Sequence, residues 1–197
     1  MAKIILDLCG GTGSWSKPYV EAGYDVRLIT LPEYDVLNYD PPDNVYGILA
    51  APPCEQFSFA RTNAKTPRDL IKGMVVVRAC LDIIWKVQEC QQDTGSKQTS
   101  LTFWALENPY HGLLKRFLGN PPFIFNPYDF GDPYKKKTGL WGYYNEPVKH
   151  PVTPVDTKFD MLKSKDIHPE YFGILDRKTR RAITPPGFAN AFFKANQ

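Results

Sequence analysis

Two side chains in this sequence have the chemistry of a reactive pair, a thiol and a carboxyl group. Cys54 follows the dipeptide Pro52-Pro53, whose rings fix the backbone dihedrals of the loop. A lone cysteine is usually a small buried hydrophobe, but one held in a single orientation after an apolar segment is a candidate nucleophile. Glu107 closes another apolar segment, where a carboxylate is costly unless it has a partner. The alternative for Glu107 is an acid that caps a helix, and nearness to Cys54 would decide between them.

A glycine-rich turn is the third candidate. Glycines let a backbone approach a ligand closely, and amides at the start of a helix can meet polar groups. The turn lacks the Gly-Lys-Ser/Thr ending of a phosphate-binding loop and the spacing of the dinucleotide fingerprint. A ligand loop and a plain strand-to-helix turn therefore both remain open for its residues, which are Leu8, Cys9, Gly10, Gly11, Thr12, Gly13 and Ser14.

All three candidates lie where a predicted strand ends. Short apolar runs indicate buried strands, and leucine, methionine, valine and isoleucine at three- and four-residue steps indicate one long helix. A strand, a glycine-rich turn, a short helix and a second strand within about thirty residues are typical of a βαβ unit. The predicted strands are Ile4–Leu8, Tyr24–Leu31, Tyr46–Ala51 and Leu101–Leu106, and the predicted helices are 17–21, 68–90 and 112–118.

These elements predict an α/β fold, a doubly wound sheet with helices on both faces. In such sheets ligands bind beyond the carboxyl ends of the strands, which is where the candidates lie. After residue 119 the pattern weakens: 123–125 and 139–141 are candidate strands, and 145–165 has no clear period. The length of 197 residues suits a single domain over residues 1–197.

Composition excludes several classes of protein. Four cysteines at irregular spacing and three histidines argue against a metal site and a disulfide scaffold. No apolar run approaches the ~20 residues of a membrane span, and the apolar strand directly after the first residues predicts no secretory leader, so we expect a cytoplasmic protein. The net charge of +3 permits a polyanionic partner without requiring one.

The order of these motifs resembles that of cytosine-5 DNA methyltransferases, and most closely the small versions that phages carry. The matching segments are Asp-Leu-Cys-Gly-Gly-Thr-Gly, Pro-Pro-Cys-Glu-Gln-Phe-Ser, Glu-Asn-Pro and a closing Pro-Gly-Phe-Ala-Asn, and together they span nearly the whole chain. The Pro-Pro-Cys and Glu-Asn segments are specific, whereas the other two are supportive. The resemblance implies a Rossmann-like sheet, S-adenosylmethionine as cofactor, DNA as partner and a phage protein in the cytoplasm of its host.

The resemblance also implies roles for individual residues. Cys54 matches the nucleophile that adds to carbon 6 of cytosine, for which we expect a lowered pKa, and Glu107 matches the acid at ring nitrogen 3. The implied cofactor residues are 8–14 together with Asp35, Val36, Pro52 and Asn190. The acid that the family has for the ribose is not obvious at the end of the second strand, unless Glu33 serves. The implied substrate residues are Ser58, Asn108, Lys135, Lys136 and Lys137.

The sequence departs from the family pattern in ways that leave alternatives open. Pro109 stands where the family usually has valine, and the arginine-rich active-site strand is represented by Lys135–Lys137, whose plain interpretation is a solvated turn. Only a short insertion, about 143–182, stands in place of a target-recognition domain, which leaves target specificity open to a protein partner or an oligomer. The alternatives are the same chemistry on a nucleotide or RNA, another methyl donor, or a nucleic-acid-binding module that has lost catalysis.

Overall fold

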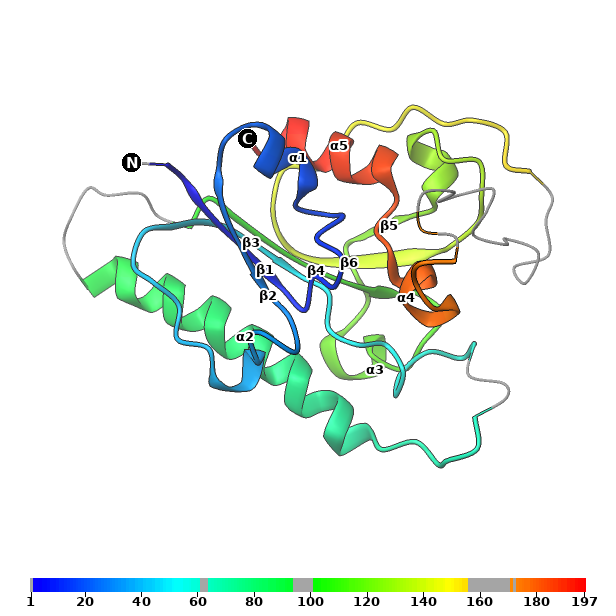
Figure 1. Cartoon of the computed structure of the whole chain (residues 1–197), viewed down its shortest axis with the longest axis horizontal. Coiled ribbons are helices and arrows are strands. Elements are labelled where there is room, and N and C mark those ends of the chain that lie inside the picture. Colours follow the sequence, from blue (N-terminus) through cyan, green and yellow to red (C-terminus); the bar gives the residue numbers. More distant parts are fainter. Residues whose placement is uncertain (1, 61–63, 94–100, 156–170, 172) are drawn as a thin grey trace.

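A six-stranded sheet is the centre of the computed structural model, which describes residues 2–60, 64–93, 101–155, 171 and 173–197. The strand order is β2-β1-β3-β4-β6-β5 (Figure 1). The strands are β1 (Ile4–Leu8), β2 (Asp25–Ile29), β3 (Val45–Ala50), β4 (Phe103–Pro109), β5 (Phe123–Phe125) and β6 (Thr138–Tyr143).

The first four strands are parallel, and the last two complete the sheet in a mixed arrangement. From β1 the chain goes to β2 on one side and then returns to β3 on the other side. In open α/β sheets, ligands bind beyond the carboxyl ends of the strands at such a reversal of strand order. Strand β6 runs antiparallel to both β4 and β5, between which it lies. The segment predicted as a strand at 139–141 is thus an interior strand, and its glycine-rich sequence allows close packing.

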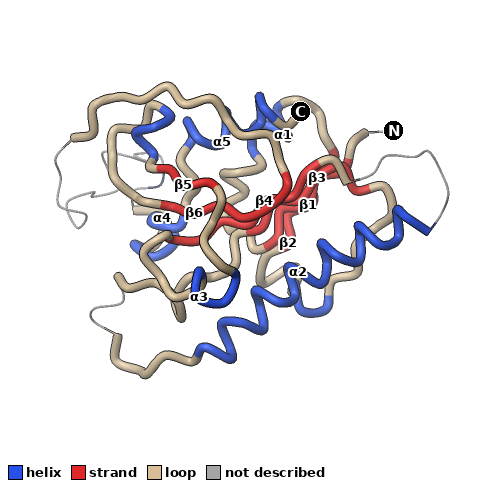
Figure 2. The backbone as a smooth tube through the Cα atoms, turned by 180° about the vertical axis from the view of Figure 1, so that it is seen from behind, coloured by secondary structure: helices blue, strands red, loops and turns tan. Residues whose placement is uncertain are grey.

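Helices cover both faces of the sheet, as predicted. The long helix α2 (Leu70–Asp93) lies along one face, whereas α1 (Lys17–Glu21) and α5 (Pro186–Ala195) lie on the other (Figures 1 and 2). The shorter elements are α3 (Lys115–Leu118), α4 (Arg177–Ala182) and the 3₁₀ turns at Val36–Asn38 and Pro127–Phe130. None of the helices in the described ranges is long and apolar enough to cross a membrane.

Alternate residues of the strands supply the two cores, because successive side chains of a strand point to opposite faces. Leu6 and Leu8 of β1 pack on the α2 side with Val77 and Ile84. On the other side Ile5 joins a largely aromatic cluster whose buried members include Trp15, Tyr19, Phe103, Phe125, Phe188 and Phe192. The two cores account for the near-continuous apolar runs of the central strands.

The helix predicted at 112–118 is wrong in its first turn, since α3 begins only at Lys115. Gly112 instead pairs with Ser58, and the Leu113 amide donates to the Phe57 carbonyl at 2.9 Å. Pairing with this loop gives the backbone groups of these residues the hydrogen bonds that a helix would otherwise provide. Of the predicted insertion at 143–182, residues 156–170 and 172 lie outside the described part of the chain.

Candidate active site

The register of the sheet brings the candidate residues to one edge. Leu8 pairs with Ala50, and Ala50 pairs with Leu106, so the carboxyl ends of β1, β3 and β4 lie in one row. The glycine-rich turn and the Pro-Pro-Cys loop therefore leave the sheet side by side, next to Glu107 of β4. This arrangement depends on the non-local pairing of the strands.

The loop that follows β3 holds Cys54 at the start of a tight turn. The Cys54 carbonyl accepts hydrogen bonds from the amides of Phe57 and Ser58 at 2.9 and 2.8 Å. The Phe57 side chain is completely buried and anchors the turn to the core. Cys54 itself is half-buried, and the Ser58 hydroxyl, a predicted substrate contact, accepts from the Ala60 amide.

Asn108 joins the end of β4 to this loop. Its side-chain amide donates to the Pro52 carbonyl at 3.0 Å, and the residue is only 1% exposed. Within the described residues the Asn108 Oδ1 atom has no hydrogen-bond partner. The structure thus places Asn108 and Pro52, predicted for substrate and cofactor, inside the framework that fixes the position of Cys54.

Glu107 and Cys54 are electrostatic neighbours, and Lys136 acts on both. Burial raises the pKa of the Cys54 thiol, the Glu107 carboxylate raises it further, and Lys136 opposes both effects. Burial also raises the pKa of Glu107, again against Lys136. The expectation of a lowered Cys54 pKa is therefore wrong for the protein alone, because desolvation and a nearby acid outweigh one lysine. Nearness to Cys54 favours the reactive interpretation of Glu107 over a capping acid.

Arg68 is a site residue that the sequence analysis missed. Its guanidinium donates to the carbonyls of Gln56 and Ser58 at 2.9 and 2.8 Å, and the Asp69 amide donates to the Gln56 side chain. One planar fork therefore holds two carbonyls of the loop that carries Cys54. A single arginine before a helix carries no sequence signal for such a role.

We expect Arg68→Lys and Arg68→Ala to loosen the Cys54 loop. An ammonium group lacks the fork that reaches both carbonyls, and each charge-assisted hydrogen bond is worth about 1.5–3 kcal/mol. Amide exchange of Phe57 and Ser58, measured by mass spectrometry, should become about tenfold faster or more. Arg78→Ala, which removes an exposed arginine paired with Asp82, is the control. Equal amide-exchange rates in the Arg68 variants and the wild type would show that Arg68 does not hold the Cys54 loop in place.

The glycine-rich turn is built over a buried acid. Asp7 is completely buried, and the Ser16 hydroxyl donates to its Oδ2 atom at 2.6 Å, while Oδ1 has no partner within the described residues. Burial raises the Asp7 pKa to about 6 against the hydrogen bonds from Ser16. A Cβ atom on Gly10 would lie 2.3 Å from the Asp7 carboxyl carbon, so this turn position requires glycine. The sequence analysis did not identify Asp7 as a site residue.

Asp7→Asn should change how stability depends on pH. A carboxyl group whose pKa rises from 3.8 to about 6 on folding stabilises the protein below pH 4 and loses that contribution as pH rises through 6. The variant's free energy of unfolding relative to the wild type should therefore increase with pH by about 3 kcal/mol in all, of which about 2 kcal/mol falls between pH 4.5 and 7.5, and then level off. Urea titrations at pH 4.5, 6 and 7.5 measure it. Asp82→Asn on exposed α2 is the control, and parallel pH profiles for Asp7→Asn and the wild type would contradict the prediction.

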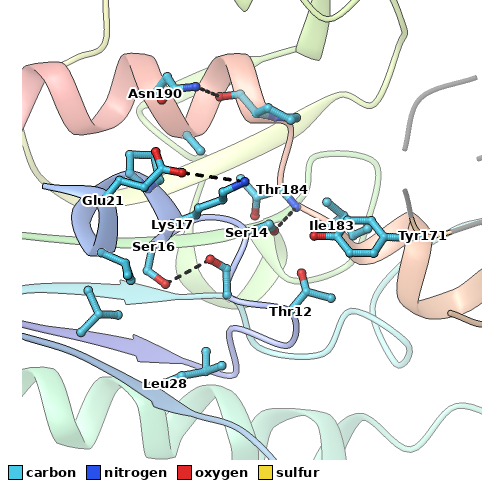
Figure 3. A pocket seen from close by; sticks show the side chains of 16 residues that line it. Thr12, Ser14, Ser16, Lys17, Glu21, Leu28, Tyr171, Ile183, Thr184 and Asn190 are labelled. Carbon is cyan, nitrogen blue, oxygen red and sulfur yellow. Dashed lines mark hydrogen bonds and ion pairs between the residues drawn. The ribbon is translucent and has the colours of Figure 1, made fainter. Parts of the chain in front are cut away.

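A cavity of about 480 Å³ lies beside the glycine-rich turn. Thr12, Gly13 and Ser14 form one wall, and α1 and the segment from Ile183 to Asn190 form the others (Figure 3). The Thr184 amide donates to the Ser14 hydroxyl at 2.9 Å, which ties the turn to the C-terminal segment. The cavity has the size of a pocket for a small molecule. Its lining mixes polar groups such as Thr12 with apolar side chains such as Leu28.

The structure brings only part of the predicted cofactor set to this cavity. Thr12, Gly13, Ser14 and Asn190 line it. Leu8 and Val36 are core residues, whereas Gly11 and Glu33 are exposed. The Asp35 carboxylate caps a 3₁₀ turn by accepting from the Leu37 amide at 3.0 Å.

Cys9 forms a contact that the sequence did not indicate. A hydrogen bond with Cys80 of α2 lowers the Cys9 pKa, against burial and the charges of Asp7 and Asp35. Cys9 thus connects the glycine-rich turn to the helix on the opposite face from the cavity.

The three predicted lysines have different surroundings. Lys136 donates to the Ile183 carbonyl at 3.2 Å, so it connects the cavity wall to the pair of Cys54 and Glu107. Lys135 is exposed. Lys137 is exposed as well and lies over the Tyr110 ring, with its Nζ atom 4.6 Å from the ring centroid.

Over the described ranges, the structure has no group of three or more histidine, cysteine, aspartate or glutamate side chains that could hold a metal ion. Compared with models of known protein families and with curated protein sequences, the chain shows no significant match.

Proposed function

We propose that this protein is an S-adenosylmethionine-dependent methyltransferase of Rossmann-like fold that acts on carbon 5 of cytosine in DNA. One observation carries the proposal: Cys54, held after a rigid diproline, and Glu107 are electrostatic neighbours at the carboxyl edge of the sheet. A thiol beside an acid whose pKa is raised is the pair that nucleophilic addition to a pyrimidine requires. The motif order that resembles cytosine-5 DNA methyltransferases agrees with this pair.

The residues around the cavity fit the proposed cofactor. Thr12, Gly13 and Ser14 would hold it from the glycine-rich turn, and Asn190 from α5. About 480 Å³ with a mixed polar and apolar lining suits a molecule that has both a nucleoside and an amino-acid part. When bound, S-adenosylmethionine supplies a methyl group attached to a positively charged sulfur.

The chain's own residues supply the activation of the base. Cys54 must lose its proton to add to carbon 6, and the positive charge of Lys136 favours the thiolate. Burial favours the protonated form of Glu107, which can therefore donate to ring nitrogen 3 as carbon 6 is attacked. Asn108 and Arg68 keep the Cys54 loop in place through its backbone carbonyls. In a duplex, the target base must leave the stack to reach this pair.

Transfer of a radiolabelled methyl group tests the proposal directly. Duplex DNA, single-stranded DNA, RNA and cytidine nucleotides are incubated in parallel with the protein and labelled S-adenosylmethionine. We expect label in the DNA samples, recovered as 5-methylcytosine after digestion to nucleosides. Label found only in RNA or in nucleotides would identify that sample, instead of DNA, as the methyl acceptor. Absence of label from every sample, with cofactor binding shown by calorimetry, would favour a binding module without catalysis.

A further inference from the structure

Two lysines share one tyrosine ring beside the candidate site. The Nζ atoms of Lys115 and Lys137 lie 4.0 and 4.6 Å from the centroid of the Tyr110 ring, which is the range of cation–π interactions. The His111 ring contacts the same tyrosine edge-on at 5.3 Å. We call Tyr110, Lys115 and Lys137 the lysine–tyrosine cluster.

The backbone holds this cluster together across the sequence. The Tyr110 amide donates to the Lys137 carbonyl at 3.0 Å, which continues the pairing of β4 and β6 beyond Pro109 and Thr138. Lys115 comes from the first residue of α3. The two ammonium groups are therefore positioned by the sheet and by a helix.

The cluster concentrates positive charge without a matching acid. Within the described residues, the ion pairs of lysine involve Lys17, Lys86 and Lys149, and none joins Lys115 or Lys137 to a carboxylate. Two like charges on one ring repel each other, and a ring quadrupole compensates only partly. Anionic groups that contact the two ammonium groups would reduce this repulsion.

The cluster also lies next to the loop that carries Cys54. Tyr110 is three residues beyond Glu107, and the neighbouring His111 carbonyl accepts from the Phe59 amide at 3.2 Å. Phe59 lies five residues after Cys54, and its side chain is 49% exposed. Exposed aromatic side chains together with cations are typical of surfaces that bind nucleic acid.

We propose that the lysine–tyrosine cluster binds the phosphodiester backbone of DNA next to the base that enters the site. The inference rests on the proposed function and assigns the phosphate contacts to Lys115 and Lys137. Lys136, which the sequence groups with Lys137, is directed to the Ile183 carbonyl and acts on Cys54 and Glu107 instead. Tyr110 orders both lysines before DNA arrives, which reduces the entropy that binding would cost.

The salt dependence of DNA binding tests the cluster. A fluorescein-labelled duplex is titrated with wild type and Lys115→Ala/Lys137→Ala at several salt concentrations, with anisotropy as the readout. Each phosphate contact contributes about 0.9 to the slope of log K against log salt, so the double variant should lower its magnitude by about 1.8. Tyr110→Phe, which keeps the ring, should retain the wild-type slope, whereas Tyr110→Leu should weaken binding.

Lys149→Ala is the matched control, because Lys149 also lies over an aromatic ring, that of Phe123, but is paired with Asp129. This variant removes one positive charge, as each of the two substitutions in the cluster does, and it should leave the salt slope unchanged. If the double variant is folded and keeps the wild-type slope while the wild type methylates DNA, the assignment of phosphate contacts to the cluster is wrong and the proposed reaction stands. If the double variant has the smaller slope but the wild type transfers no methyl group, the proposed reaction is wrong and the DNA-binding role of the cluster is supported.

Discussion

DNA that contains 5-fluorocytosine is expected to capture the wild-type protein covalently, and Cys54→Ser is expected to abolish the capture. The Cys54 sulfur forms a bond to carbon 6 of the base. With S-adenosylmethionine present, carbon 5 would then accept the methyl group, which makes the addition irreversible. Carbon 5 carries fluorine in place of the proton whose removal would release the protein, and fluorine cannot leave as a cation, so the adduct persists. Serine ionises far less readily than cysteine, and loss of a nucleophile commonly costs a thousandfold or more. Denaturing gels that show a protein–DNA band measure the outcome.

The control for loss of a thiol is Cys80→Ala, a change in the core at the contact with Cys9. It should still form the adduct, provided that its melting temperature shows a folded protein. A wild-type protein that binds both cofactor and fluorinated DNA but forms no adduct would contradict nucleophilic addition by Cys54. Adduct formation by Cys54→Ser would assign the nucleophile to another residue.

The second large effect is expected from Glu107→Gln, which retains the shape of the side chain but removes its acidic proton. Adduct formation should slow by roughly 100- to 10,000-fold, since that is the usual worth of general acid–base assistance. DNA affinity, measured by anisotropy, should change little. A slowing of less than about tenfold would show that Glu107 is not the acid.

The same substitution should have the opposite effect on the thiol. The Glu107 carboxylate raises the Cys54 pKa, so its removal should lower that pKa and speed alkylation of Cys54 by iodoacetamide at pH 8. Slower methyl transfer together with faster alkylation would separate the acid's chemical role from general damage to the site. A decrease in both rates would indicate that Glu107 mainly supports the structure. Glu89→Gln, which removes an exposed acid on α2, is the control.

The cavity and the reactive pair are connected through the C-terminal segment, although they are separate in sequence. The Thr184 amide donates to the Ser14 hydroxyl (Figure 3). The adjacent Ile183 carbonyl accepts from Lys136. The C-terminal segment therefore contacts both the glycine-rich turn and the lysine that acts on Cys54. Asn190, which the resemblance assigns to the cofactor, lines this cavity.

Much of the fold follows from local sequence patterns. The apolar runs of β3 and of β1, the latter interrupted only by Asp7, indicate strands covered on both faces. The three- and four-residue spacing of apolar residues indicates α2. The diproline before Cys54 and the glycine-rich turn are local signals too, since they act through the dihedrals of a few residues. The sequence by itself therefore determined the central strands, the long helix and the segments in which chemistry is expected.

Other features were decided only by the tertiary structure, because they depend on contacts between residues far apart in the chain. The antiparallel strand β6 enters beside β4 and brings Lys136 to Glu107 and Lys137 to Tyr110. Arg68 reaches back to the Cys54 loop, and Asn108 turns inward to Pro52. The raised Cys54 pKa has the same origin, since burial and a charge from another strand outweigh what the local sequence suggests.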